Sequence, residues 1–193
     1  MKNTAYNSDT IRGAAALQRS RAYASPGDFC TIFRDDMNSL YSLALVLTSS
    51  HELADKAFLA ALDDCRTGNS VFSEWARSWS RRAVIKSAIR LLDPIRPGRG
   101  DVPAANMEAI ASEMDPSGHA CLRLETFERF VFVISVLEGY AVRECATLLG
   151  AIPREVEQAR VQALQKIAGN KQNILPVSHD NTQRAANSIF TLH

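Results

Sequence analysis

The sequence lacks the residue groupings that catalysis and metal binding require. Its four histidines are His51, His119, His179 and His193, and none has metal-ligand spacing to a Cys, Asp or Glu on a shared helix face. No glycine-rich phosphate-binding loop and no nucleophile elbow occur. We therefore expect a protein that is not an enzyme and that needs neither a metal nor a cofactor.

The sequence also lacks a disulfide framework and a membrane span. Its four cysteines, Cys30, Cys65, Cys121 and Cys145, form no CxxC pair, which fits a reducing cytosol. Cys30 and Cys145 lie in apolar helical patterns, where a free thiol packs as a small hydrophobe. The longest apolar run, Phe130 to Leu137, is far shorter than the about 20 residues that span a bilayer. We expect a cytoplasmic protein without a membrane partner.

Positive and negative side chains nearly balance over the whole chain, but they are unevenly distributed along it. The formal net charge is only +1. Acidic residues dominate 28–65 and 101–138, whereas residues 71–100 carry seven basic and two acidic side chains. This alternation predicts separate acidic and basic surfaces. Since 46% of the residues are hydrophobic, the chain can also bury a substantial core.

Apolar residues recur at helical spacing over most of the chain, and no segment alternates with the period of two that indicates a strand. We predict helices over residues 28–48, 51–65, 73–92, 122–137, 142–149 and 153–168. Prolines and glycines concentrate between residues 93 and 118. The chain is therefore expected to be all-α, with two small helical domains at 28–92 and 121–168, an acidic flexible linker at 93–120, and disordered tails at 1–27 and 169–193.

Helix ends are also indicated by the sequence. Asp28 can cap the first helix, and one of the serines that follow Thr48 can cap the second. Gly68 and Asn69 should end that second helix, because both residues tolerate positive φ.

The predicted third helix combines cations with two tryptophans. Residues four apart share a helix face, so the basic side chains should form one positive strip beside the indoles. Cations that hold phosphates and aromatic rings that stack on unpaired bases are typical of single-strand binding sites. The alternative is a solvated basic face with the tryptophans in the core. The residues are Trp75, Arg77, Trp79, Arg81, Arg82, Lys86 and Arg90.

Residues 139–156 have the pattern of a helix-turn-helix. Ala146 is small enough for a second helix to cross, Gly150 can adopt the left-handed conformation of a tight turn, and Val156 returns to the core. Arg154, Gln158 and Gln162 of the second helix would then contact DNA. An ordinary helical hairpin is the alternative.

The order of these parts resembles the extracytoplasmic-function type of bacterial sigma factor. Residues 29–48 are similar to the opening helix of that family, and 76–89 to the helix that melts and reads the minus-ten element. Residues 139–167 are similar to the module for the minus-thirty-five element. The resemblance covers about residues 28–92 and 122–168.

The resemblance implies a transcription initiation factor that is monomeric when free. It would bind core RNA polymerase and promoter DNA, and it could be controlled by an anti-sigma protein. Asp55, Lys56, Leu59 and Ala60 lie in the segment similar to the polymerase-binding helix. The family usually carries an acid, a Gln and a second acid where this chain has Lys56, Leu59 and Ala60.

Two alternatives follow from the residues themselves. A sigma-like helical protein could act as a protein-interaction module through its apolar Leu59 and Ala60 surface. A plain helix-turn-helix regulator would explain residues 122–168 but would leave the N-terminal helices without a role.

Overall fold

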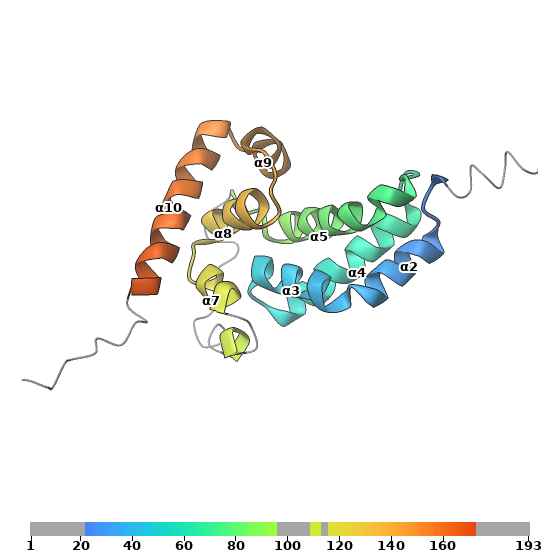
Figure 1. The fold of residues 1–193 in the computed structure, drawn as a ribbon, viewed down its shortest axis with the longest axis horizontal. Helices are drawn as coiled ribbons and strands as arrows, with labels where there is room; N and C mark the ends of the chain where they lie inside the picture. Colours follow the sequence, from blue (N-terminus) through green and yellow to red (C-terminus); the bar gives the residue numbers. More distant parts are fainter. Residues whose placement is uncertain (1–21, 96–108, 113–115, 173–193) are drawn as a thin grey trace, which may run out of the picture.

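A computed structural model describes residues 22–95, 109–112 and 116–172, and in these residues it confirms the all-α prediction (Figure 1). The elements are α2 (Pro26–Asp35), α3 (Met37–Thr48), α4 (His51–Thr67), the 3₁₀ turn η1 (Ser73–Trp75), α5 (Ala76–Leu92), α7 (Pro116–Leu122), α8 (Thr126–Phe132), the π-helical turn η2 (Val133–Leu137), α9 (Val142–Leu149) and α10 (Pro153–Gln172).

Helices α2 to α5 pack together, with α4 against α2, α3 and α5. Small side chains allow this close approach: Ala54, Ala57 and Ala61 of α4 are each 0% exposed. On α5 the buried face is also built mainly of small residues, including Ser80 and Ala88. Small residues on α4 and α5 therefore let these two helices pack closely against each other.

The single helix predicted over residues 28–48 is wrong, because the chain breaks at Asp36 into α2 and α3. The Asp36 carboxylate accepts a hydrogen bond from Arg77 of α5, a long-range contact that local periodicity does not contain. Asp28 is also not the N-cap. Ser25 caps α2 by accepting from the Asp28 N–H at 3.2 Å, and the Asp28 carboxylate accepts in return from the Ser25 N–H at 2.8 Å.

Helix α4 ends near Gly68 as predicted, but for a different physical reason. Gly68 follows the helix as expected, but its φ is −77°, not positive. A Cβ at this position would lie 2.5 Å from the Asp64 carbonyl oxygen, so glycine is needed for close approach of the backbone. The start of α4 is confirmed, since the Ser50 hydroxyl accepts from the Leu53 N–H.

The C-terminal half has two helices joined by a tight turn at the predicted position. Helices α9 and α10 flank Gly150, which has a φ of +71°. Ala146 and Val156 are buried as expected, at 3% and 0% exposed. The helix predicted over 122–137 is interrupted, however: α7 ends at Leu122, α8 begins at Thr126, and the last turn is a π-helix.

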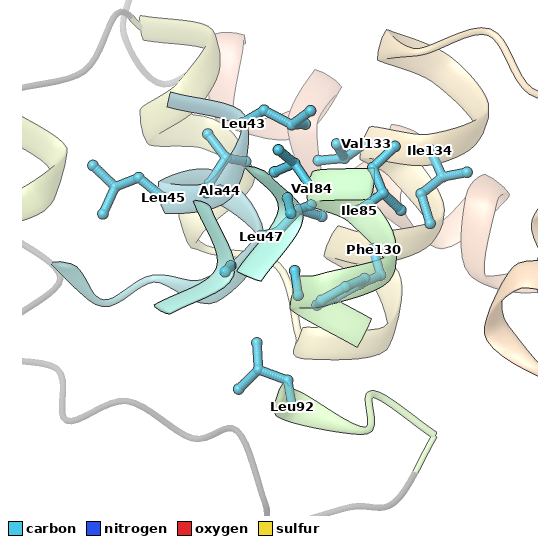
Figure 2. Packing of buried hydrophobic residues seen from close by; sticks show 14 of the residues in the cluster. Leu43, Ala44, Leu45, Leu47, Val84, Ile85, Leu92, Phe130, Val133 and Ile134 are labelled. Atoms are coloured by element: carbon cyan, nitrogen blue, oxygen red, sulfur yellow. The ribbon is translucent and has the colours of Figure 1, made fainter. Parts of the chain in front are cut away.

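The two halves share one hydrophobic cluster. Phe130, Val133 and Ile134 of the C-terminal half lie alongside Val84 and Ile85 of α5 in this cluster (Figure 2). Helix α8 also contacts α3. The predicted division into two separate domains is therefore not visible in this packing.

The predicted linker and tails are described only in part. Ile110, in a short helical stretch at 109–112, is 2% exposed, and α7 contributes the buried Cys121 and Leu122 to the core. Tyr23, assigned to the N-terminal tail, forms an isolated β-bridge with Phe72. Residues 1–21, 96–108, 113–115 and 173–193 lie outside the described residues.

Replacing Phe130 with Ala is expected to lower the free energy of unfolding by about 3–5 kcal/mol, because it removes a fully buried ring from the cluster that joins the halves. Urea denaturation followed by circular dichroism measures this change. Leu137→Ala, at a side chain 53% exposed, is the control and should cost about 0.5 kcal/mol or less. Equal losses in the two variants would contradict the burial of the Phe130 ring.

Candidate nucleic-acid interface

The tryptophans of the third predicted helix lie on the surface. Trp75 is 57% exposed and Trp79 is 39% exposed, so neither indole is part of the buried core. Trp75 and Trp79 each precede a buried small residue, Ala76 and Ser80 respectively. One residue turns a helix by about 100°, so when the small residue faces the core the indole before it points away from the core. The reading that placed both tryptophans in the core is therefore excluded.

Aromatic rings from two distant segments gather at the N-terminal end of α5. Tyr23 stacks on Phe72 with ring centroids 4.7 Å apart, and Phe72 meets Trp75 edge to face at 5.2 Å. The Ala24 N–H donates to the Val71 carbonyl at 2.8 Å, which holds the two segments together. Tyr23, Phe72 and Trp75 are all at least 38% exposed and form an aromatic cluster.

Tyr23 and Phe72 were not among the predicted site residues. Phe72 lies three residues before Trp75, a spacing that could have drawn attention to it. Tyr23 carries no such signal, because its position depends on a bridge between residues far apart in the chain.

The cations of α5 divide into groups with different partners. Arg77 pairs with Asp36, the N-cap residue of α3, and Arg90 pairs with Asp64 of α4. Both pairs are partly exposed, so solvent and salt screen them and they contribute little to stability. Lys86 is exposed and has no ion-pair partner within the described residues.

Arg81 and Arg82 instead face the C-terminal half. Arg81 donates two hydrogen bonds to the Glu138 carboxylate, one from Nε to Oε2 at 2.7 Å and one from a terminal nitrogen to Oε1, and a third to the Ser39 hydroxyl at 2.8 Å. The hydrogen bond with Glu138 raises the pKa of Arg81 above its usual value. The Arg82 guanidinium lies 5.5 Å from the centroid of the Tyr140 ring.

These contacts line a groove between α5 and the turn that precedes α9. Its walls are Ser78, Arg81, Glu138, Gly139, Tyr140 and Glu144. The groove holds both signs of charge, so Arg81 is not a free cation in this arrangement.

The three residues predicted to contact DNA from α10 occur together. Arg154, Gln158 and Gln162 line one shallow hollow on the exposed side of this helix. Glu157 lies on the same surface and would repel a phosphate. The neighbouring Glu155 accepts a hydrogen bond from the Ile152 N–H at 3.2 Å, which caps the start of α10.

The predicted polymerase-binding residues all lie on the exposed face of α4. Leu59 is 62% exposed, the highest value among the large hydrophobic side chains of the described residues. Lys56 pairs with Glu52 at 2.6 Å, and Asp55 accepts from the Tyr41 hydroxyl at 2.9 Å. With the exposed Ala60, Leu59 forms an apolar spot between charged neighbours.

The described residues contain no group of three or more His, Cys, Asp or Glu side chains placed to hold a metal ion. None of the helices in these residues has the length and apolar character needed to cross a membrane. Comparisons with protein-family models, curated proteins and solved structures find no match to this chain.

The cysteines differ from the prediction at one position. Cys30 is exposed, whereas Cys65, Cys121 and Cys145 are buried. Burial raises the pKa of Cys65 and of Cys145 from 9.0 to about 11. Thiolate, the reactive form, is therefore scarce at these two positions.

Alkylation with iodoacetamide at mildly alkaline pH should modify Cys30 first, because its thiol is accessible to the reagent. Cys65 and Cys145 should react at a comparable rate only after denaturation. Peptide mass spectrometry of the native and denatured protein measures both rates. Labelling of native Cys145 as fast as Cys30 would contradict the packing of α9.

Proposed function

We propose that this chain is a sigma-type transcription initiation factor that binds promoter DNA through the aromatic cluster and the cations of α5. The observation that carries the proposal is the exposure of Trp75, just before α5, and of Trp79 and Lys86 on α5. Proteins that bind single strands combine aromatic stacking platforms with a positively charged path for the backbone. An exposed indole pair costs hydrophobic stabilisation, which a stacking role would explain.

In this proposal the aromatic side chains stack on unpaired bases, and nearby cations hold the phosphates. The C-terminal helix-turn-helix contacts upstream duplex, with Gln158 and Gln162 suited to bidentate pairing with adenine. Arg154 supplies a phosphate or guanine contact from the start of α10. The two halves would act as the two domains of such a factor, with the segment between α5 and α7 as the linker.

The α4 face would bind core RNA polymerase. Leu59 and Ala60 form an apolar contact there, flanked by Asp55 and Lys56. Apolar side chains at the centre of a charged surface are suitable anchors for a protein interface. An anti-sigma partner could compete for the same face.

A second candidate is a protein-interaction module without promoter function. The strong exposure of Leu59 favours it, because this side chain suits a regulatory helix as well as a polymerase clamp. Binding to DNA and binding to polymerase are therefore tested separately.

Trp75→Ala is expected to weaken binding of a fluorescent single-stranded oligonucleotide by about 1–3 kcal/mol, because one stacking surface is lost. Lys86→Ala should weaken it less and should also reduce its salt dependence. Fluorescence anisotropy at a fixed salt concentration measures both affinities. Leu59→Ala is the matched control, since it removes an exposed apolar side chain outside the cluster. If all three variants bind like the parent chain, α5 is only a solvated basic face.

Core RNA polymerase should co-purify with the chain and should start run-off transcripts at a fixed position in its presence. Leu59→Glu is expected to weaken that association by about tenfold, because it places a charge at the apolar centre of the face. Ile152→Glu is the control, at a side chain 57% exposed in the C-terminal half. A chain that ignores core enzyme but forms a one-to-one complex with another small protein would support the interaction module instead.

A further inference from the structure

The contact between Arg81 and Glu138 joins the proposed DNA-binding helix to the C-terminal half. The Glu138 side chain is only 9% exposed, whereas that of Arg81 is 36% exposed. Two hydrogen bonds from one guanidinium to one carboxylate form a fork, and arginine binds phosphate oxygens with the same fork. A carboxylate and a phosphate cannot occupy that fork at the same time.

The turn that carries Glu138 is firmly held. The Glu138 N–H donates to the Val133 carbonyl at 2.9 Å, and the Tyr140 N–H donates to the Ile134 carbonyl at 3.1 Å. Between them Gly139 has a φ of +72°, a conformation that favours glycine. Because Val133 and Ile134 are buried in the shared cluster, the turn has a defined position relative to α5.

The same turn engages the neighbouring cation. Tyr140 lies against Arg82, the residue that follows Arg81. Two adjacent cations of α5 are therefore covered by two residues of a single three-residue turn. By contrast, Trp75, Trp79 and Lys86 are left exposed.

We propose that Glu138 is an intramolecular competitor that occupies on Arg81 the position of a nucleic-acid phosphate. In the closed chain the turn at 138–140 masks the central cations of α5, and a bound strand must displace it to gain those contacts. This inference rests on the proposed function, since it assumes that α5 binds a strand. It adds that the free chain is restrained from binding at full affinity, and that the C-terminal half supplies the restraint.

The decisive variant is Glu138→Gln, which keeps the size of the side chain but removes the charge that holds Arg81. It should bind a single-stranded oligonucleotide about three- to tenfold more tightly than the parent chain. One additional phosphate contact should also steepen the slope of log affinity against log salt by about 0.7. Fluorescence anisotropy over a salt series measures both quantities.

Three further variants make the test specific. Glu144→Gln removes a carboxylate that lines the same groove but bonds to the Ala141 N–H, and it should change affinity by less than about twofold. Glu138→Asp keeps the net charge but shortens the side chain, so it should also tighten binding. In an Arg81→Ala background, Glu138→Gln should have no effect, because the contested phosphate site is gone.

The outcomes separate this inference from the proposed function. If Glu138→Gln binds more tightly and this gain disappears in the Arg81→Ala background, the competitor role of Glu138 is supported. Binding that is seen only in Glu138→Gln and not in the parent chain supports it as well. If the parent chain binds through Trp75 and Glu138→Gln binds equally well, the competitor is overturned and the proposed function stands. Tightening that persists without Arg81 also overturns it, as a general charge effect. If no variant binds, both proposals fail.

Discussion

The structure depends on the junction where α8 contacts α3 and Phe130 enters the shared hydrophobic cluster. At its centre is Arg129, a cation only 3% exposed, which donates from Nε to the Leu47 carbonyl at 3.3 Å and from Nη1 to the Leu124 carbonyl at 3.2 Å. A buried charge is costly unless it is hydrogen-bonded, and the Leu47 carbonyl belongs to the last turn of α3, where a cation is favoured. This contact and the adjacent Phe130 tie the C-terminal half to the N-terminal bundle.

The position of the proposed nucleic-acid surface follows from that junction. Once α8 is seated, η2 continues from it to Leu137, and the next residue, Glu138, meets Arg81. A second pair, Glu128 with Lys166 at 2.7 Å, holds α8 to α10. The C-terminal half therefore acts on α5 in two ways. It helps to bury one face of that helix, and it covers two cations on another face.

Local patterns predicted the helices well and the site only in part. The positions of α4, α9 and the turn at Gly150 follow from apolar spacing and from serine and glycine chemistry, which act within a few residues. Local pattern left the place of the tryptophans open, because large apolar side chains are usually buried, whereas here small residues such as Ala76 and Ser80 face the core. The partners of Arg81 and Phe72 could not be predicted, since Glu138 and Tyr23 come from distant segments.

Sequence alone is enough to predict the all-α class, most helix positions and a cationic helix accompanied by two indoles. These properties depend on periodicity and composition, which are written along the chain. Long-range contacts are needed to explain the break at Asp36, the exposure of the indoles and the pairing of Arg81 with Glu138. Each depends on side chains that meet across tens of residues: Asp36 meets Arg77, the Phe72 ring beside Trp75 meets Tyr23, and Arg81 meets Glu138. No local preference along the chain specifies these contacts.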